Sequence, residues 1–371
     1  MPRPTVLVAA FSARQIAESA RRAGYDALAV DFFGDLDLKE SALRGEVLRG
    51  HYPDGFDGGD LLDALDRLAK GQSPVGFVYG AGFEDRPELI EAIAARWALL
   101  GNDAATVRTL KDPERFAALC AEADIPHPEI RREPPKDASR WLSKQIGGAG
   151  GSHVQPAASQ PPAANRYFQR FVAGERWSAG IVAAGNKLAL LGFTRQWAAP
   201  SIAERYRYGG AVGPLQPPEP AGHDMLAQMQ RLVARVPLTG LCSVDFVLTP
   251  DGPVLLEVNP RGGATIDVFD TDAEPLFGLH LGACQGRLPG CFIGPRQVRA
   301  TGLAWADADV TLPEHFVWPD WTRDRSAPPV VFHAGQPLCT IVAEAATPTA
   351  AQALFDSRVA DMQERVGRRA A

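Results

Sequence analysis

The chain has 371 residues, of which 46% are apolar and 22% charged, as in ordinary globular proteins of two or three domains. A formal charge of -6 and a pI near 5.7 argue against binding to nucleic acid or to an anionic membrane surface. The five cysteines lack CxxC spacing, so neither a disulfide framework nor a zinc site is indicated. No apolar stretch approaches the ~20 residues of a transmembrane helix, and we expect a cytoplasmic protein.

The first 105 residues alternate strand and helix. An apolar run at 4–10 precedes a helical pattern at 12–23, which Ser12 can cap, and a second strand at 27–31 follows. The unit recurs with a strand at 75–79 and a helix at 84–97. This alternation predicts a doubly wound parallel sheet covered by helices.

Polar residues follow several of these strands. Ligands of doubly wound sheets bind beyond the carboxyl ends of the strands. That rule singles out Ser12, Arg14, Asp31, Asp35 and the turn at 80–84, which ends in Glu84. Capping and turn roles explain these residues equally well. The turn after the first strand has no glycine, which argues against a dinucleotide-binding fingerprint.

A helix opened by Asp112 and Pro113 ends before Pro126, and short strand candidates with turn signals follow. They predict a small antiparallel lobe, with strands at 140–144, 167–172, 179–183 and 188–191.

A glycine-rich loop follows Lys144 inside this region. Its residues are Gly147, Gly148, Gly150, Gly151 and Ser152. Glycines let backbone N–H groups approach a phosphate closely, although a flexible linker has the same composition. No Lys-Ser or Lys-Thr follows the glycines, so this is not a Walker A loop. The strand at 167–172 offers edge backbone groups and an aromatic wall for a base, and Glu175 offers an acceptor for ribose hydroxyls; a plain core strand is the alternative.

After a helix at 222–236, two strands meet at the turn 249–253. If Asp251 is the centre of the turn, Asp245 directly faces Glu257, and Asn259 shares their face because side chains alternate. The opposite face is apolar, with Val244, Phe246, Leu248, Leu256 and Val258. Opposed carboxylates repel unless a cation lies between them, so the polar face predicts a Mg²⁺ or Mn²⁺ site. A solvated face with two ordinary acids is the alternative.

Beyond Pro289 the chain has strand candidates at 298–304 and 339–343 and a helix at 348–368, and residues 301–371 form its last part. We expect it to pack on the lobe that contains the hairpin.

Taken in order, these motifs resemble the ATP-grasp superfamily. They are Lys111, Lys144, the loop 147–152, the strand 167–172 with Glu175, Asp245, and the run from Glu257 through Asn259 to Arg261. The phrases at 80–84, 191–196 and 279–284 resemble a predicted ATP-dependent carboligase group that is distantly related to biotin carboxylase. Two features depart from the superfamily pattern: Asp245 stands where Glu is commoner, and the spacer 155–164 shortens the small lobe.

The resemblance implies a Rossmann-like domain at 1–105 and an ATP-grasp domain at 106–300. The latter has a small lobe at about 125–185 and a large lobe at about 186–300. Lys111 and Lys144 would contact nucleotide phosphates, and Asp245, Glu257 and Asn259 would bind two divalent metals. The backbone of Gln169, Arg170, Phe171 and Val172 would hold adenine, Glu175 would hold ribose, and Arg261 would stabilise the transferred phosphoryl group.

The activity implied is an ATP-dependent ligase that joins a small-molecule carboxylate to an amine through an acyl phosphate and releases ADP. Arg195, counted as catalytic with Lys144 and Arg261, is a candidate carboxylate anchor, as is Arg207, because a guanidinium binds a carboxylate bidentately. Surface charge explains both equally well. The alternatives are a carboxylase that activates bicarbonate, a phosphotransferase, and a non-catalytic ATP-binding regulatory module. A homodimer is compatible with each.

Overall fold

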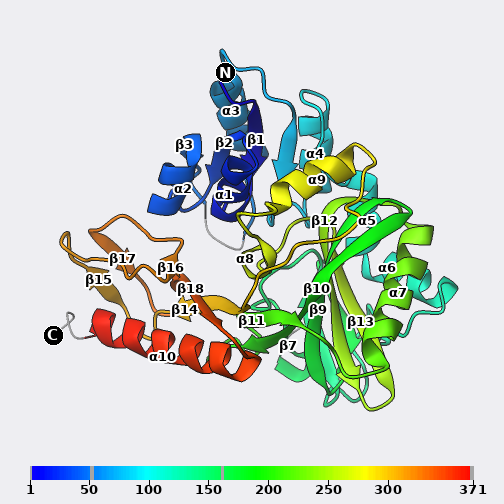
Figure 1. Ribbon diagram of the computed structural model, residues 1–371. Coiled ribbons are helices and arrows are strands. Elements are labelled where there is room, and N and C mark those ends of the chain that lie inside the picture. The colour runs from blue at the N-terminus through cyan, green and yellow to red at the C-terminus, as the bar shows by residue number, and fades with distance from the viewer. Residues whose placement is uncertain (1, 51–53, 160–162, 368–371) are drawn as a thin grey trace.

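The computed structural model describes residues 2–50, 54–159 and 163–367. A parallel sheet at the N-terminus lies above a large antiparallel sheet, and a long C-terminal helix runs along the far end of that large sheet (Figure 1). Among the described helices, none has both the length and the apolar character needed to cross a bilayer.

The N-terminal domain is built on a four-stranded sheet of order β3-β2-β1-β4, in which every neighbouring pair is parallel. This confirms the predicted doubly wound domain. Its elements, with the two helices that leave it, are β1 (Thr5–Ala9), α1 (Arg14–Arg22), β2 (Asp26–Asp31), α2 (Leu36–Ser41), β3 (Ala42–Val47), α3 (Gly58–Ala69), β4 (Phe77–Tyr79), α4 (Pro87–Ala94), α5 (Ala104–Lys111) and α6 (Pro113–Glu122).

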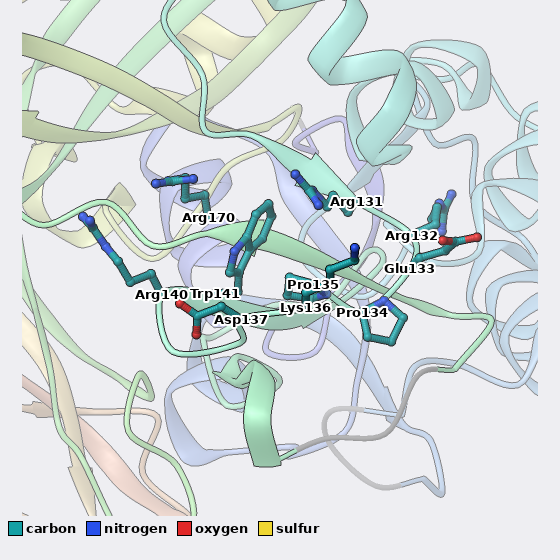
Figure 2. A pocket seen from close by; sticks show the side chains of 10 residues that line it. All are labelled: Arg131, Arg132, Glu133, Pro134, Pro135, Lys136, Asp137, Arg140, Trp141 and Arg170. Atoms are coloured by element: carbon teal, nitrogen blue, oxygen red, sulfur yellow. The ribbon is translucent and has the colours of Figure 1, made fainter.

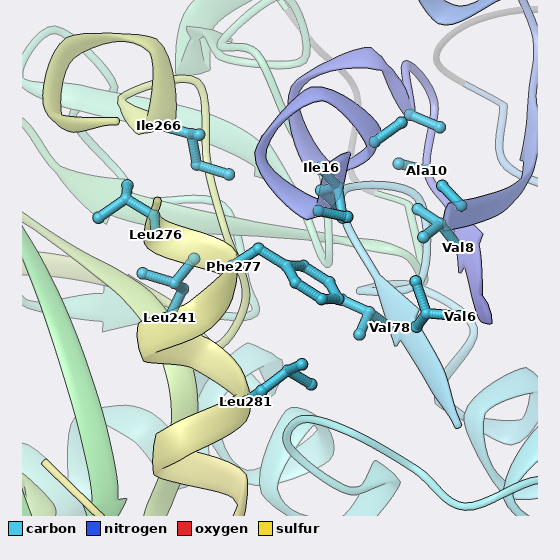
Figure 3. Close-up of a cluster of buried hydrophobic side chains, with 14 of the residues drawn as sticks. Val6, Val8, Ala10, Ile16, Val78, Leu241, Ile266, Leu276, Phe277 and Leu281 are labelled. Carbon is cyan, nitrogen blue, oxygen red and sulfur yellow. The ribbon is translucent and has the colours of Figure 1, made fainter. Parts of the chain in front are cut away.

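Strand β1 is buried on both faces because helices cover both sides of the sheet. Val6 and Val8 pack into one core, and Leu7 and Ala9 pack into another on the opposite side. The first of these cores continues across the domain boundary, where Phe277 points between the two domains (Figure 3). The N-terminal domain is therefore joined to the large sheet by shared apolar packing.

Helix α1 begins two residues later than the pattern predicts. Ala13 is the residue before the helix and makes no side-chain cap, and the Ser12 hydroxyl donates instead to Asp324 at 2.9 Å. Ser12 therefore contacts the C-terminal part of the chain, which the local sequence pattern does not show.

The small lobe is a four-stranded antiparallel sheet of order β5-β8-β6-β7. Its strands are β5 (Ile130–Arg131), β6 (Trp141–Gln145), β7 (Gln155–Pro156) and β8 (Arg166–Arg170), with a short 3-10 helix, η1 (Ala157–Ser159), beside them. The predicted antiparallel lobe is present with the strands expected at 140–144 and 167–172, whereas those expected at 179–183 and 188–191 belong to the large sheet.

The large sheet has eight strands in the order β13-β12-β9-β10-β11-β14-β18-β16, with antiparallel pairing throughout. Its strands and helices are β9 (Glu175–Gly185), β10 (Lys187–Ala198), β11 (Tyr208–Leu215), α7 (Ala221–Arg235), β12 (Leu238–Thr249), β13 (Gly252–Asn259), α8 (Ile266–Phe269), α9 (Leu276–Cys284), β14 (Val298–Trp305), β16 (Thr322–Arg323), β18 (Pro337–Ala345) and α10 (Pro348–Gly367). A separate ribbon pairs β15 (Val310–Leu312) with β17 (Val330–Phe332). Strand β9 lies between β12 and β10, so the boundary between the lobes falls before residue 175 and not at 185.

The hairpin of β12 and β13 has the predicted pairing but a different turn. Thr249 faces Gly252, which leaves a two-residue loop, one residue shorter than the pattern predicts. A bulge at Leu256 adds the missing residue, so Asp245 faces Glu257 and Ser243 faces Asn259. The bulge also corrects the predicted apolar face, because Leu255 is fully buried in the core in place of Leu256.

Candidate active site

The two acids of the hairpin lie side by side at the centre of the candidate site. Burial raises the pKa of Asp245 to about 6, and the charge of Glu257 adds to that effect. Burial acts on Glu257 too, but Lys111 and Lys144 outweigh it and lower its pKa to about 2. The Asn259 amide donates to Asp245 at 3.2 Å. Glu257 is therefore the acid whose negative charge is matched by nearby cations.

Two lysines reach these acids from different parts of the chain. Lys111, at the end of α5, donates to Glu257 and to the Asn259 side chain, the latter at 2.8 Å. Lys144, on β6, is buried and donates to Gln169 at 3.3 Å, with its ammonium over the Tyr167 ring. Burial alone lowers the pKa of Lys144, but Tyr167 and Glu257 outweigh it and raise that pKa. Both predicted phosphate ligands thus lie beside the hairpin acids.

A narrow pocket opens between the small sheet and β13 beside these charges. Leu110, Phe116, Ile130 and Leu256 give it apolar walls, and Lys111, Lys144 and Glu257 lie at its polar end. The bulged residue Leu256 therefore has a place in the pocket. Apolar walls beside a cluster of cations suit a ligand with a flat ring and phosphates.

The glycine loop is held between three parts of the molecule. Gly147, Gly150 and Gly151 have φ values of 69°, 71° and 77°, the left-handed region that favours glycine. A Cβ on Gly147 would lie 2.7 Å from the backbone nitrogen of Asp85 in the N-terminal domain. Tyr208, at the start of β11, donates its backbone N–H to the Gly150 carbonyl at 2.9 Å. The loop therefore requires glycine for its conformation and for its packing.

Only some of the other predicted loop and strand residues lie at the pocket. Gly148 lines it and packs against the His153 ring, and burial and the charge of Lys144 lower the pKa of His153 to about 3. Ser152 uses its carbonyl to accept from Gln155 at 3.3 Å. Gln169 lies on the pocket side and accepts from Lys144.

The predicted adenine and ribose residues beyond Gln169 lie outside the pocket lining. Arg170 is exposed and pairs with Glu129 at 3.6 Å. Phe171 is 40% exposed and donates its N–H to the Arg140 carbonyl, and Val172 follows it in the link to the large sheet. Glu175 is exposed at the start of β9 and accepts from the Trp177 indole at 3.3 Å.

Strand register places Arg195 away from the site. Asp245 faces Ser178, and Ser178 faces Thr194, so these side chains share one face of the large sheet. Arg195 faces Trp177, which packs in the core on the opposite face. Its predicted catalytic role therefore fails on geometry, because one step along a strand reverses the side chain.

Arg207 is buried for a structural reason. Its guanidinium donates to the Ala199 carbonyl at 3.0 Å and stacks 4.1 Å from the Trp305 ring centre. These contacts fix the connection between β10 and β11, against which the glycine loop packs.

Arg261 and Glu84 form a buried ion pair across the domain boundary. The Nε of Arg261 donates to Glu84 at 2.7 Å, and its Nη2 lies 2.6 Å from the same oxygen. The N-terminal turn at 80–84 thus reaches the arginine that was predicted to act on the phosphoryl group. The sequence of the turn indicated Glu84 as a candidate site residue, but it did not indicate that Arg261 is its partner. Tyr167 was missed as a site residue, because its place opposite Lys144 depends on the pairing of β6 with β8, which the local sequence pattern does not determine.

A larger cavity of ≈ 590 Å³ lies on the other face of the small sheet. Register separates the faces: Lys144 pairs with Tyr167 on the inner face, whereas Trp141 pairs with Arg170 on the outer face. Figure 2 shows Trp141 between Arg140 and Arg170 on one side and Arg131 and Lys136 on the other. These cations are exposed, and the lining holds none of the predicted metal ligands. The inner pocket is therefore the candidate active site, although it is smaller.

The polar hairpin face fits a hard divalent cation. Two carboxylates and an amide oxygen are the donor types that Mg²⁺ prefers, and phosphate oxygens commonly complete its shell. Within the described ranges, no group of three or more His, Cys, Asp or Glu could hold a metal by itself. Asp245, Glu257 and Asn259 would therefore hold the ion together with a phosphate-bearing ligand.

The three-part arrangement, with a strand-hairpin acid pair facing a lysine and a glycine loop across two antiparallel lobes, defines an ATP-grasp architecture. Residues 114–265 match the ATP-grasp domain family. The chain therefore contains an ATP-grasp domain over these residues.

Solved structures share this fold over nearly the whole chain. The ADP complex of N5-carboxyaminoimidazole ribonucleotide synthetase matches 98% of this chain and 98% of its own, with a TM-score of 0.69 and 15% identity. L-amino acid ligase from Bacillus licheniformis matches 97% and 98%, with a TM-score of 0.70 and 14% identity. Biotin carboxylase from Campylobacter jejuni matches 94% and 89%, with a TM-score of 0.70 and 10% identity. At these identities the likeness establishes the fold alone.

Proposed function

We propose that the protein is an ATP-dependent carboxylate–amine ligase that forms an amide and releases ADP and phosphate. The observation that carries the proposal is the convergence of Lys111 and Lys144 on the opposed acids Asp245 and Glu257. The fold it shares with an L-amino acid ligase supports the same reaction class.

The chain's residues would bind the nucleotide by charge and shape. Lys144 and the backbone N–H groups of the glycine loop would neutralise phosphate oxygens, and the apolar walls of the inner pocket would hold the base. Asp245, Glu257 and Asn259 would hold Mg²⁺, which when bound neutralises phosphate charge. Arg261 would bind the anionic group where the carboxylate and the phosphate meet.

The reaction needs no protein nucleophile. A substrate carboxylate oxygen attacks the γ-phosphorus of ATP, the bond to the ADP oxygen breaks, and an acyl phosphate forms. The amine then attacks the acyl carbon, loses a proton, and expels inorganic phosphate as the amide forms. The protein's contribution is to orient the groups and to stabilise the developing negative charge, which is how phosphoryl-transfer sites act in general.

The experiment supplies the purified protein with ATP, Mg²⁺ and mixtures of amino acids and amines, and follows ADP and new masses. ADP that forms only when acid and amine are both present supports the ligase. Formation of AMP and pyrophosphate would contradict the acyl-phosphate mechanism.

A second candidate is a carboxylase that activates bicarbonate. The fold it shares with biotin carboxylase and with N5-carboxyaminoimidazole ribonucleotide synthetase favours it. The same assay separates the two: ADP formation that depends on bicarbonate, and that continues without any other carboxylate, identifies the carboxylase.

A further inference from the structure

Arg261 depends on the N-terminal domain for its position. It follows β13 in the large sheet, whereas Glu84 lies 177 residues earlier in the turn after β4. The exposed fractions are 9% for Arg261 and 5% for Glu84. A charge-assisted pair with this burial is strong and strictly oriented, because water does not compete for either group.

Glu84 is itself held rigidly. One carboxylate oxygen contacts Arg261, and the other accepts the backbone N–H groups of Gly82 at 2.8 Å and Phe83 at 3.1 Å. Burial disfavours the ionised carboxylate, but Arg261 and Lys111 outweigh it and lower the pKa of Glu84. Glu84 therefore offers Arg261 a charged partner whose orientation is set by its own turn.

The backbone beside Arg261 is held from the same domain. The Asn102 amide donates to the Pro260 carbonyl at 2.8 Å and to the Thr239 carbonyl at 3.0 Å. The Tyr79 hydroxyl lies 2.7 Å from the Asn102 carbonyl and 3.4 Å from the Pro260 carbonyl. Both the main chain before Arg261 and its side chain are thus anchored to residues near the ends of the N-terminal strands.

These contacts leave the outer end of the guanidinium available. Arginine has five N–H donors. Glu84 takes the Nε proton and one on Nη2, and Nη1 donates to the Gly262 carbonyl at 3.2 Å. Among the contacts of Arg261 within the described ranges, this leaves one donor on each terminal nitrogen. Two donors on the terminal nitrogens are what an end-on, bidentate contact with a carboxylate or phosphoryl group requires.

We propose that Glu84 is a positioning residue: it binds the Nε and Nη2 side of Arg261 so that the end of the guanidinium faces the reacting acyl and phosphoryl groups. The proposal rests on the proposed function and deepens it. The adjacent residue, Asp85, packs against Gly147 of the glycine loop, so one turn of the N-terminal domain supports both the arginine and the phosphate loop.

The test begins with Glu84→Gln, which keeps the shape but removes the charge. We expect kcat for ADP formation to fall about 100-fold, the loss typical of one displaced charge-stabilising group. The Kd for ATP, measured by calorimetry, should stay within a few-fold of wild type, because Glu84 acts on the reacting end only. Glu88→Gln, an exposed acid on the neighbouring helix, is the matched control and should leave kcat unchanged.

A double-mutant cycle separates positioning from a direct role. If Glu84 works through Arg261, then Glu84→Gln should lower kcat little further in an Arg261→Lys background. Equal losses in both backgrounds would show that Glu84 acts independently and would overturn the proposal.

Two further controls distinguish a folding defect, a failure of the proposed function and a failure of the positioning role. If Glu84→Gln fails to fold, Glu84→Asp is used, which keeps the charge but withdraws it from Arg261; an unchanged kcat in that variant overturns the proposal. A wild-type chain that forms no ADP with any substrate refutes the proposed function. An active wild type with additive losses refutes the positioning role alone.

Discussion

The two faces of the small sheet carry cations in opposite ways. On the inner face Lys144 is buried, contacts Gln169 and Tyr167, and is electrostatically linked to Glu257. On the outer face the side chain of Arg131 is half exposed. It lines a larger cavity together with other exposed cations. Buried charges interact strongly because little water screens them, whereas exposed pairs contribute little. Burial and matched charge, and not cavity size, are therefore the reasons for placing the candidate site on the inner face.

The largest effect is expected on the inner side, for Glu257→Gln. The change removes the charge that faces Asp245 and pairs with Lys111. Loss of a metal-binding carboxylate costs several kcal/mol of transition-state stabilisation, so ADP formation should fall by about 1,000-fold. Steady-state ADP release measures it, with Glu344→Gln on β18 as an exposed control. A variant that keeps a tenth of the wild-type rate would remove Glu257 from the metal site.

Lys144→Met should have the next largest effect. It keeps much of the length of the side chain but removes the buried ammonium beside Glu257. Loss of one phosphate-stabilising cation should lower kcat/KM for ATP by about 100-fold. Lys187→Met, at the exposed start of β10, is the control. Equal behaviour of the two variants would mean that the inner face holds no phosphate.

Gly147→Ala tests the loop that closes the inner pocket. A left-handed alanine costs about 1–2 kcal/mol, and its Cβ would also collide with the Asp85 backbone. Gly185→Ala is a matched control, because Gly185 has a φ of 64° and no atom within 4 Å of an added Cβ. Thermal unfolding should show a lower melting temperature for both variants. Calorimetry should show an approximately tenfold weaker ATP affinity for Gly147→Ala alone. Unchanged ATP binding in Gly147→Ala would separate the loop from the nucleotide.

The smallest effect is expected on the outer face. In the double variant Arg131→Ala and Arg140→Ala, ADP formation should change by less than about twofold, because exposed ion pairs contribute only about 0–1 kcal/mol. Initial rates at low and at physiological salt measure it. A tenfold loss would give the outer cavity a part in turnover and break the contrast between the two faces.

Local patterns predicted most strands and helices and the hairpin partners. They failed where the pairing of distant segments determines which sheet a strand joins or which way a side chain points. The match of Asp245 to Glu257 was correct although the turn is shorter, because a bulge at Leu256 makes up the difference. Strand β3 was missed because most of its side chains are exposed, so its sequence carries little apolar periodicity.

The failure at Arg195 has the same origin. Its charge and its neighbours in sequence suggested an anchor, but the register of β10 against β9 decides which way it points. That register also moved β9 from the small lobe to the large sheet.

By itself the sequence determined the class of fold, the acid pair, the lysine before the glycine loop and the arginine after the acids. These are local features, since alternation, turn residues and left-handed glycines act over a few residues. Only the tertiary structure decided which face of each sheet is used and which partner holds Arg261. That partner, Glu84, is 177 residues away, and no periodicity spans such a separation. The packing of two domains against each other brings the pair together.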